Sequence, residues 1–143
     1  MNSNRKIAKE KLAKDGYTLI LYDGNELISS KKRGIAPLLE LYESGRDFSS
    51  FSAIDRVVGR AAAFMYVLLG IKSIFAVCIS ELALDVLENA KISVEYDEKV
   101  PKISNRDGTG QCPMEDAVKN IIAPGEACKA IKEKLIELSN TKK

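Results

Sequence analysis

The 143-residue chain contains no histidine, and this absence excludes several kinds of chemistry. Serine–histidine and cysteine–histidine catalysis are impossible, and the commonest protein ligand of metal ions is missing. Any acid–base step must therefore use the side chains of Asp, Glu, Lys, Tyr or Cys.

Cysteine is also scarce. The three residues, Cys78, Cys112 and Cys128, are an odd number without close pairing, which is not typical of a disulfide framework. We therefore expect reduced thiols. Because the chain has no C-x-x-C pair, we expect neither a zinc site nor another cofactor.

No apolar stretch is long enough to span a bilayer. The longest, 61–71, falls well short of the roughly 20 residues that a membrane-spanning helix needs. Residues 2–6 are not followed by the apolar core of a signal peptide, so a cytoplasmic protein is expected. Acidic and basic residues nearly cancel to a net charge of +2, which favours neither nucleic acid nor acidic lipid as a partner.

Length and a hydrophobic content of 45% predict a single domain over residues 1–143. The apolar pattern predicts helices at 4–14, 35–44, 55–70, 81–89, 113–122 and 126–138, and strands at 17–22, 26–30, 72–79, 92–96 and 99–103. Asp23-Gly24 is a favoured tight-turn dipeptide, so the first two strands are predicted to form a hairpin. This order is typical of an α/β fold, a three-layer sandwich in which a mixed sheet lies between helices. The helix that joins strands 72–79 and 92–96 predicts that these strands are parallel.

In such sheets, ligands bind at the carboxyl ends of the strands and at the starts of the following helices. The end of strand 72–79 places Cys78, Ser80 and Glu81 in that position, with Ser80 as the N-cap of the next helix. The alternative for Cys78 is a small residue of the core.

A polar, glycine-containing loop, Asn105 to Cys112, precedes the helix that starts at Pro113. At the cap of this helix a Cys112 thiolate would be stabilised by the helix dipole. The free backbone amides, with Arg106 nearby, would alternatively bind an anion. In the simplest reading, Cys112 only packs at the helix start and Glu115 is its capping-box partner.

Three stretches resemble one known family: Ala53 to Ala63, Ile79 to Ala83, and Asn105 to Gly108 together with Cys112 to Glu115. They are similar to the bacterial domain-of-unknown-function family 1893, over about residues 17–134. The resemblance implies a cytidine-deaminase-like α/β/α fold. Zinc deaminases carry H-x-E or C-x-E at one helix start and P-C-x-x-C at the next. Here Asp55 and the segment Cys78 to Glu81 stand near those positions, so the resemblance implies the scaffold without its zinc.

Asp55 is predicted at the start of helix 55–70, where it either stabilises the helix dipole or binds a ligand beside Glu81. Arg56 and Arg60 are four residues apart and would share one face of that helix, either as an anion site or at its solvent edge. The basic turn that ends in Arg33 and Gly34 is a weaker phosphate-binding candidate.

These observations favour a small-molecule-binding protein, and a nucleotide- or nucleobase-like ligand is suggested by the fold analogy alone. Its pocket would contain Asp55, Cys78, Ser80, Glu81 and the loop from Asn105 to Cys112. The second hypothesis is a zinc-independent enzyme with Asp55 as base and Cys112 as nucleophile. The third is a homo-oligomeric interaction module that associates through helix 55–70 or the terminal helix.

Overall fold

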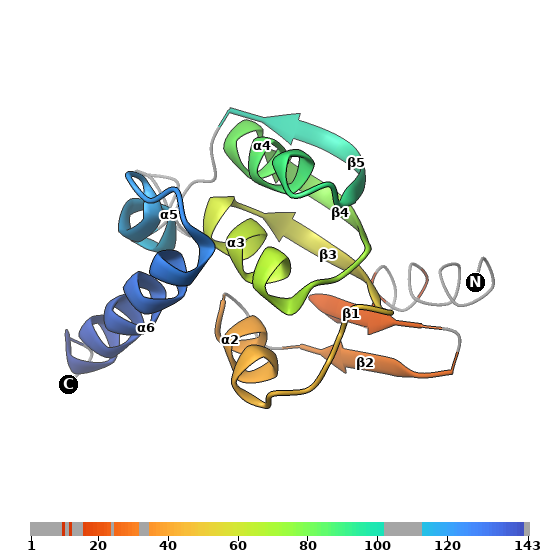
Figure 1. Ribbon diagram of the computed structural model, residues 1–143, viewed down its shortest axis with the longest axis horizontal. Helices are drawn as coiled ribbons and strands as arrows, with labels where there is room; N and C mark the ends of the chain where they lie inside the picture. Colours follow the sequence, from red (N-terminus) through yellow and green to blue (C-terminus); the bar gives the residue numbers. More distant parts are fainter. Residues whose placement is uncertain are drawn as a thin grey trace.

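The computed structural model describes residues 10, 12, 16–23, 25–31, 35–101 and 113–141. A five-stranded mixed sheet with the order β2-β1-β3-β4-β5 is its framework (Figure 1). The strands are β1 (Leu19–Tyr22), β2 (Leu27–Ser30), β3 (Ser52–Val58), β4 (Ser73–Ser80) and β5 (Ser93–Val100). β1 is antiparallel to both β2 and β3, whereas β3, β4 and β5 are parallel to one another. The predicted α/β class, the hairpin and the parallel pairing of β4 with β5 are confirmed.

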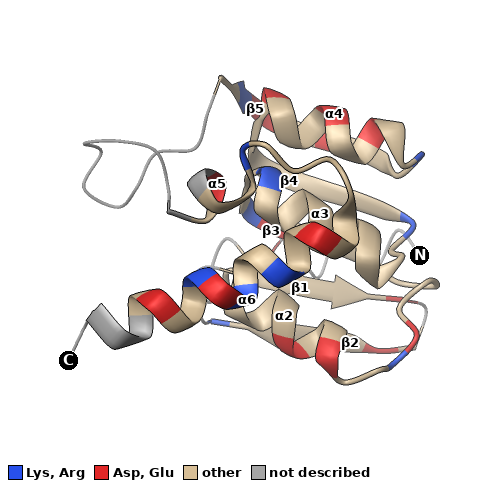
Figure 2. Ribbon diagram, turned by 60° about the vertical axis from the view of Figure 1, so that its left-hand side comes forward, with Lys and Arg blue, Asp and Glu red and all other residues tan. Residues whose placement is uncertain are grey.

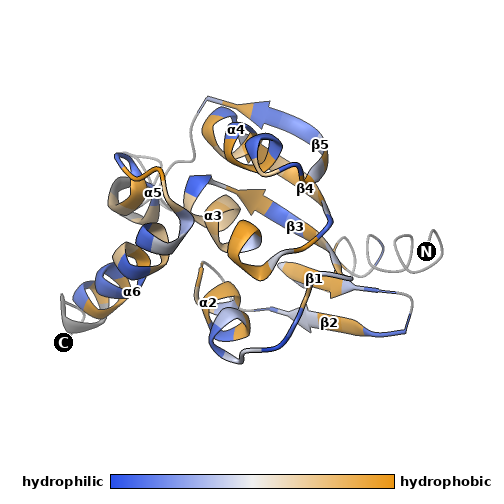
Figure 3. Ribbon diagram, viewed as in Figure 1, coloured by the Kyte–Doolittle hydropathy of each residue, from blue (hydrophilic) through white to orange (hydrophobic). Residues whose placement is uncertain are grey.

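The helices are α2 (Ala36–Glu43), α3 (Arg60–Leu69), α4 (Glu81–Asn89), α5 (Pro113–Val118) and α6 (Pro124–Thr141). α3 lies at the centre of the helical layer and contacts α2, α4, α5 and α6. It is strongly hydrophobic, whereas β5 is largely hydrophilic (Figure 3). Because α3 is surrounded by other helices of the chain, its apolar surface is already explained by packing within one copy. No helix in the described ranges is long and apolar enough to cross a membrane.

Two clusters of buried side chains lie on opposite faces of the sheet. The larger cluster joins the helices to one face and includes Ala53, Val58, Ala76 and Ile79. The smaller cluster contains Leu12 together with three strand residues, Ile20, Tyr22 and Ile54. Of the short helix predicted over residues 4–14, only residues 10 and 12 are described.

The prediction of one continuous helix over 55–70 is wrong. Residues 52–58 form the central strand β3, and the helix begins only at Arg60. Val57 and Val58 have the apolar character of the following helix, which concealed the boundary, although Gly59 marks it. At the other end, Gly70 terminates α3 in the left-handed conformation with φ 74°, which glycine adopts without strain.

Two further boundaries differ from the prediction. Segments 92–96 and 99–103 were expected to be separate strands, but residues 93–100 form one strand, β5. Its charged centre indicated a break, yet charged side chains are accommodated on an exposed edge strand. The helix expected over 113–122 ends at Val118, and α6 begins at Pro124 instead of Glu126.

Candidate functional site

The carboxyl ends of β3, β4 and β5 lie together at one end of the sheet, where α3 and α4 begin (Figure 1). The carboxyl ends of the strands are the region in which ligands bind in parallel α/β sheets. Asp55 lies three residues before the end of β3, in register with Leu19 of β1 and Ala76 of β4. It is thus a strand residue on the helical side of the sheet, not the first residue of a helix.

The side chain of Asp55 in β3 is hydrogen-bonded to a side chain of α3. The hydroxyl of Tyr66, a fully buried residue of α3, donates a hydrogen bond of 2.6 Å to Asp55 Oδ2. The backbone N–H groups of Val57 and Arg56 also hydrogen-bond this carboxyl. Asp55 itself is partly exposed, so the carboxyl is held by the protein on several sides while the residue keeps some contact with solvent.

Burial dominates the electrostatics of this pair. Desolvation raises the pKa of Asp55 from 3.8 to about 6, against the opposing effect of the hydrogen bonds from Tyr66, Val57 and Arg56. The pKa of Tyr66 is raised well above 10.0, first by desolvation and then by the negative charge of Asp55. Tyr66 therefore remains a proton donor, while Asp55 exchanges its proton close to neutral pH.

The hydrogen bonds to Asp55 coincide with an irregularity in two strands. Along β3, the side chains in the larger core cluster are Ala53 and then Val58, with Val57 between them 50% exposed. β4 also departs from strict alternation at this level, since Ala76 and Ile79 are three residues apart and are both buried in that cluster. Side-chain hydrogen bonds to the neighbouring backbone compete with the ladder and favour such shifts.

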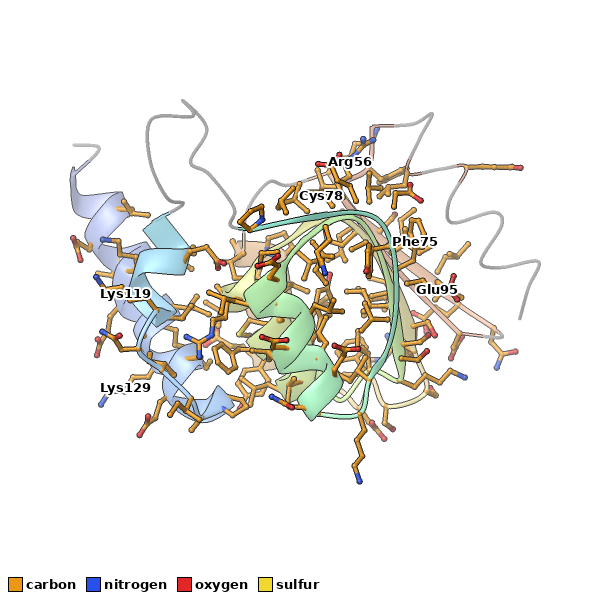
Figure 4. The ribbon with its side chains drawn as sticks, turned by 90° about the horizontal axis from the view of Figure 1, so that it is seen from above. Arg56, Phe75, Cys78, Glu95, Lys119 and Lys129 are labelled. Carbon is orange, nitrogen blue, oxygen red and sulfur yellow. The ribbon has the colours of Figure 1, made fainter. Side chains whose placement is uncertain are left out.

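Arg56 and Arg60 do not share a helix face, contrary to the prediction. Arg56 belongs to β3 and donates from Nε to the backbone oxygen of Tyr17 at 2.8 Å, and from Nη2 to that of Leu12. Its guanidinium therefore ties the segment before β1 to the sheet. Figure 4 shows Arg56 and Cys78 on the side of the sheet away from α4.

Arg60 is the first residue of α3 and connects this helix to α5. Its guanidinium donates to the backbone oxygens of Val118 and Ile121 and lies 5.0 Å from the ring centroid of Phe64. Val118 is the last residue of α5, and its carbonyl oxygen also accepts a hydrogen bond of 3.0 Å from the N–H of Ile121. A cation at the carboxyl end of a helix stabilises such carbonyl groups. An anionic ligand would have to compete with these contacts for Arg60.

Glu115 makes the reciprocal contact from α5 to α3. Its carboxylate accepts hydrogen bonds from the backbone N–H groups of Arg60 at 2.6 Å and Ala61 at 2.8 Å. It thus caps α3, a tertiary contact that the capping-box prediction did not include. A Cβ atom on Gly59 would lie 2.7 Å from the Glu115 carboxyl group, so only glycine fits there without displacement.

The prediction that Ser80 caps the helix after β4 is confirmed, whereas the ligand site predicted there stays a prediction. Ser80 caps α4, because its hydroxyl accepts a hydrogen bond of 3.1 Å from the N–H of Ala83. Glu81 is exposed at the first position of that helix. The pKa of the Cys78 thiol is raised, first by burial and then by the nearby charge of Glu98, which disfavours the thiolate.

In the strand register Asp55 pairs with Ala76, which lies four residues before Ser80 in β4. Asn105, Arg106, Cys112, Arg33 and Gly34 lie outside the described residues, so their predicted roles stay predictions. Within the described ranges no three Cys, Asp or Glu side chains are grouped so that they could hold a metal ion.

Tyr66 is the partner that sequence reasoning missed. It is the only residue with a polar side chain between Ala61 and Gly70. A buried tyrosine usually finds a hydrogen-bond partner, so Tyr66 in this apolar helix predicts that a polar group contacts its hydroxyl. The identity of that partner depends on how α3 packs on β3.

Comparison with known proteins gives one consistent result. The sequence profile described as "Domain of unknown function (DUF1893)" matches residues 7–135. The chain is also similar to the crystal structure of a DUF1893 family protein from Thermotoga maritima, with 32% sequence identity and a TM-score of 0.84 over 93% of this chain and 90% of that chain. No curated protein matches. The predicted family resemblance is thereby confirmed: the chain belongs to the DUF1893 family.

Proposed function

We propose that this protein binds a small polar molecule on a cytidine-deaminase-like scaffold, with Asp55 and Tyr66 as the polar groups of the site. The observation that supports the proposal is the raised pKa of Asp55, about 6, at a partly exposed position. At neutral pH the carboxylate is charged in surroundings that favour its neutral form, which lowers the stability of the fold. Groups that are retained against stability occur preferentially at functional sites.

The ligand class in this proposal is nucleobase- or nucleotide-like. A carboxyl group that exchanges its proton near neutral pH can accept or donate a hydrogen bond. It therefore suits a molecular edge that carries a donor beside an acceptor, as the hydrogen-bonding edges of bases do. In this proposal Ser80, the last residue of β4, and Glu81, the first residue of α4, line the same carboxyl end of the sheet.

The enzyme hypothesis is supported by the same pKa. A general base is most effective when its pKa lies near the working pH, and a value of about 6 for Asp55 meets that condition. In this version Asp55 removes a proton from the bound molecule while Tyr66 orients the carboxyl group. The nucleophile would be Cys112, outside the described residues.

A thermal-shift screen against nucleobases, nucleosides and nucleotides tests the proposal. A ligand at about 100 times its dissociation constant should add about 2.7 kcal/mol to the free energy of unfolding. We expect at least one compound to stabilise the protein, and the effect to be lost in Asp55→Asn.

The matched control is Asp85→Asn, the same substitution at an exposed position of α4. It should respond to the ligand as the unchanged protein does. Retention of the full ligand effect in Asp55→Asn, or absence of any stabilising compound, would contradict the proposal.

A further inference from the structure

β5 forms one edge of the sheet. It pairs with β4 on one side, and no described strand pairs with its other side. The strand is eight residues long, and all but Val94 and Val100 are exposed. Such an edge presents unpaired backbone N–H and C=O groups that can hydrogen-bond an added strand.

The surface around this edge is acidic. Residues 81–100, which form α4 and β5, contain six acidic and two basic residues, a net charge of −4, whereas the whole chain has +2. The remaining 123 residues therefore carry +6. Figure 2 shows acidic residues repeating along α4. Glu81, Asp85 and Glu88 are exposed and spaced by four and three residues, so they share one face of the helix.

Apolar side chains accompany these charges. Tyr96, near the centre of β5, is 40% exposed, and Leu82 in α4 is 52% exposed. Tyr96 is in register with Ala76, which faces the helices, while Asp97 is one residue further and points to the opposite face. The edge thus offers an apolar contact on one face and a carboxylate on the other.

A second copy of the same strand is a poor partner for this edge. Antiparallel pairing of β5 with itself about a two-fold axis would bring the central acidic residues, Glu95, Asp97 and Glu98, next to those of the other copy. Like charges on directly opposite or neighbouring strand positions are destabilising. Charge complementarity favours a basic partner instead.

We infer that the free edge of β5, with the acidic face of α4 beside it, binds an extended cationic segment of another protein as a sixth strand. Backbone hydrogen bonds to β5 hold the segment. Lysine or arginine side chains meet the carboxylates, and an apolar side chain covers Tyr96. This surface is separate from the Asp55 site, and its test is independent of the proposed ligand.

The probe is an eight-residue peptide in which lysine alternates with valine and threonine, titrated into the full chain by calorimetry. We expect binding at about 50 mM salt that weakens at about 500 mM, because exposed charges are screened at the higher ionic strength. The double variant Asp97→Lys, Glu98→Lys should weaken binding about tenfold, since it replaces two attractions by repulsions.

Two controls separate strand addition from simple charge attraction. The variant Glu126→Lys, Glu133→Lys makes the same change of charge at exposed positions of α6 and should leave the affinity within about twofold. A peptide of equal charge with N-methylated backbone amides cannot complete the strand and should bind weakly. No binding at low salt, equal effects of the two double variants, or undiminished binding of the methylated peptide would each overturn the inference.

Discussion

Replacing Asp55 by asparagine should change how stability depends on pH. The fold prefers the neutral carboxyl, since its pKa is about 6 in the folded state and 3.8 ordinarily. This preference stabilises the protein most below pH 3.8 and is lost as the pH rises through about 6. Asparagine cannot ionise, so its variant should lack this dependence.

The magnitude follows from the pKa difference. A rise of about two units corresponds to about 3 kcal/mol between the two protonation states, an upper limit because Asp55 is partly exposed. Between about pH 5 and about pH 7 the expected fall in the free energy of unfolding is about 1.3 kcal/mol. The amide of asparagine has a single acceptor oxygen, so the variant also loses a hydrogen bond, but that loss is independent of pH.

The chain has no histidine, the residue type whose ordinary pKa lies in this interval. The pKa of Glu26 is lowered by its hydrogen bond from Arg46, and that of Asp47 by the backbone N–H of Ser49. A lowered pKa stabilises the folded protein at every pH above the ordinary pKa of the group. This stabilisation is lost only as the pH falls through the lowered pKa. Of the described groups whose pKa is shifted, Asp55 is therefore the one whose pKa lies between about pH 5 and about pH 7.

Urea unfolding of the unchanged protein and Asp55→Asn across this interval measures the effect. The difference between the two free energies should shift in favour of the variant by about 1.3 kcal/mol from about pH 5 to about pH 7. Tyr66→Phe removes the hydrogen bond that lowers the pKa of Asp55, so the midpoint of the pH effect should move upward. Parallel pH curves for the unchanged protein and Asp55→Asn would refute the reasoning.

Two further predictions concern the helix starts. Gly59→Ala places a Cβ 2.7 Å from the Glu115 carboxyl group and should lower the free energy of unfolding by about 1–3 kcal/mol, whereas Gly125→Ala, with no atom within 4 Å, should not destabilise. Equal stabilities of the two variants in denaturant would contradict this account of Gly59. Ser80→Ala removes the hydroxyl that accepts from the N–H of Ala83 and should lower the free energy of unfolding by about 1 kcal/mol, whereas Ser80→Asp should keep most of it. A loss of similar size in both Ser80 variants would show that the cap is not the reason.

The hairpin, the helix α4 and its cap at Ser80 could be predicted because their signals are local. A tight-turn dipeptide, apolar spacing and a capping serine act over a few neighbouring residues. β3 could not be separated from α3 in the same way, since residues 52–58 have no alternating pattern of burial. Short apolar segments suit strands and helices equally well, and pairing with β1 and β4 decides between them.

The roles of charged residues depended even more on packing. Arg56 and Arg60 looked equivalent along the chain, yet Arg56 binds carbonyl groups of the N-terminal segment and Arg60 those at the end of α5. Glu115 likewise caps a helix that begins 55 residues earlier in the sequence. Partners at such separations cannot be inferred from spacing on one element.

By itself, the sequence determined the α/β class, the family, the parallel step from β4 to β5 and the exclusion of histidine chemistry. These properties depend on composition and on patterns within short segments. Only the tertiary structure decided that Asp55 meets Tyr66 and that its pKa rises to about 6. The reason is that desolvation and hydrogen bonding act through space. The packing of a helix on a sheet determines which groups surround a carboxyl.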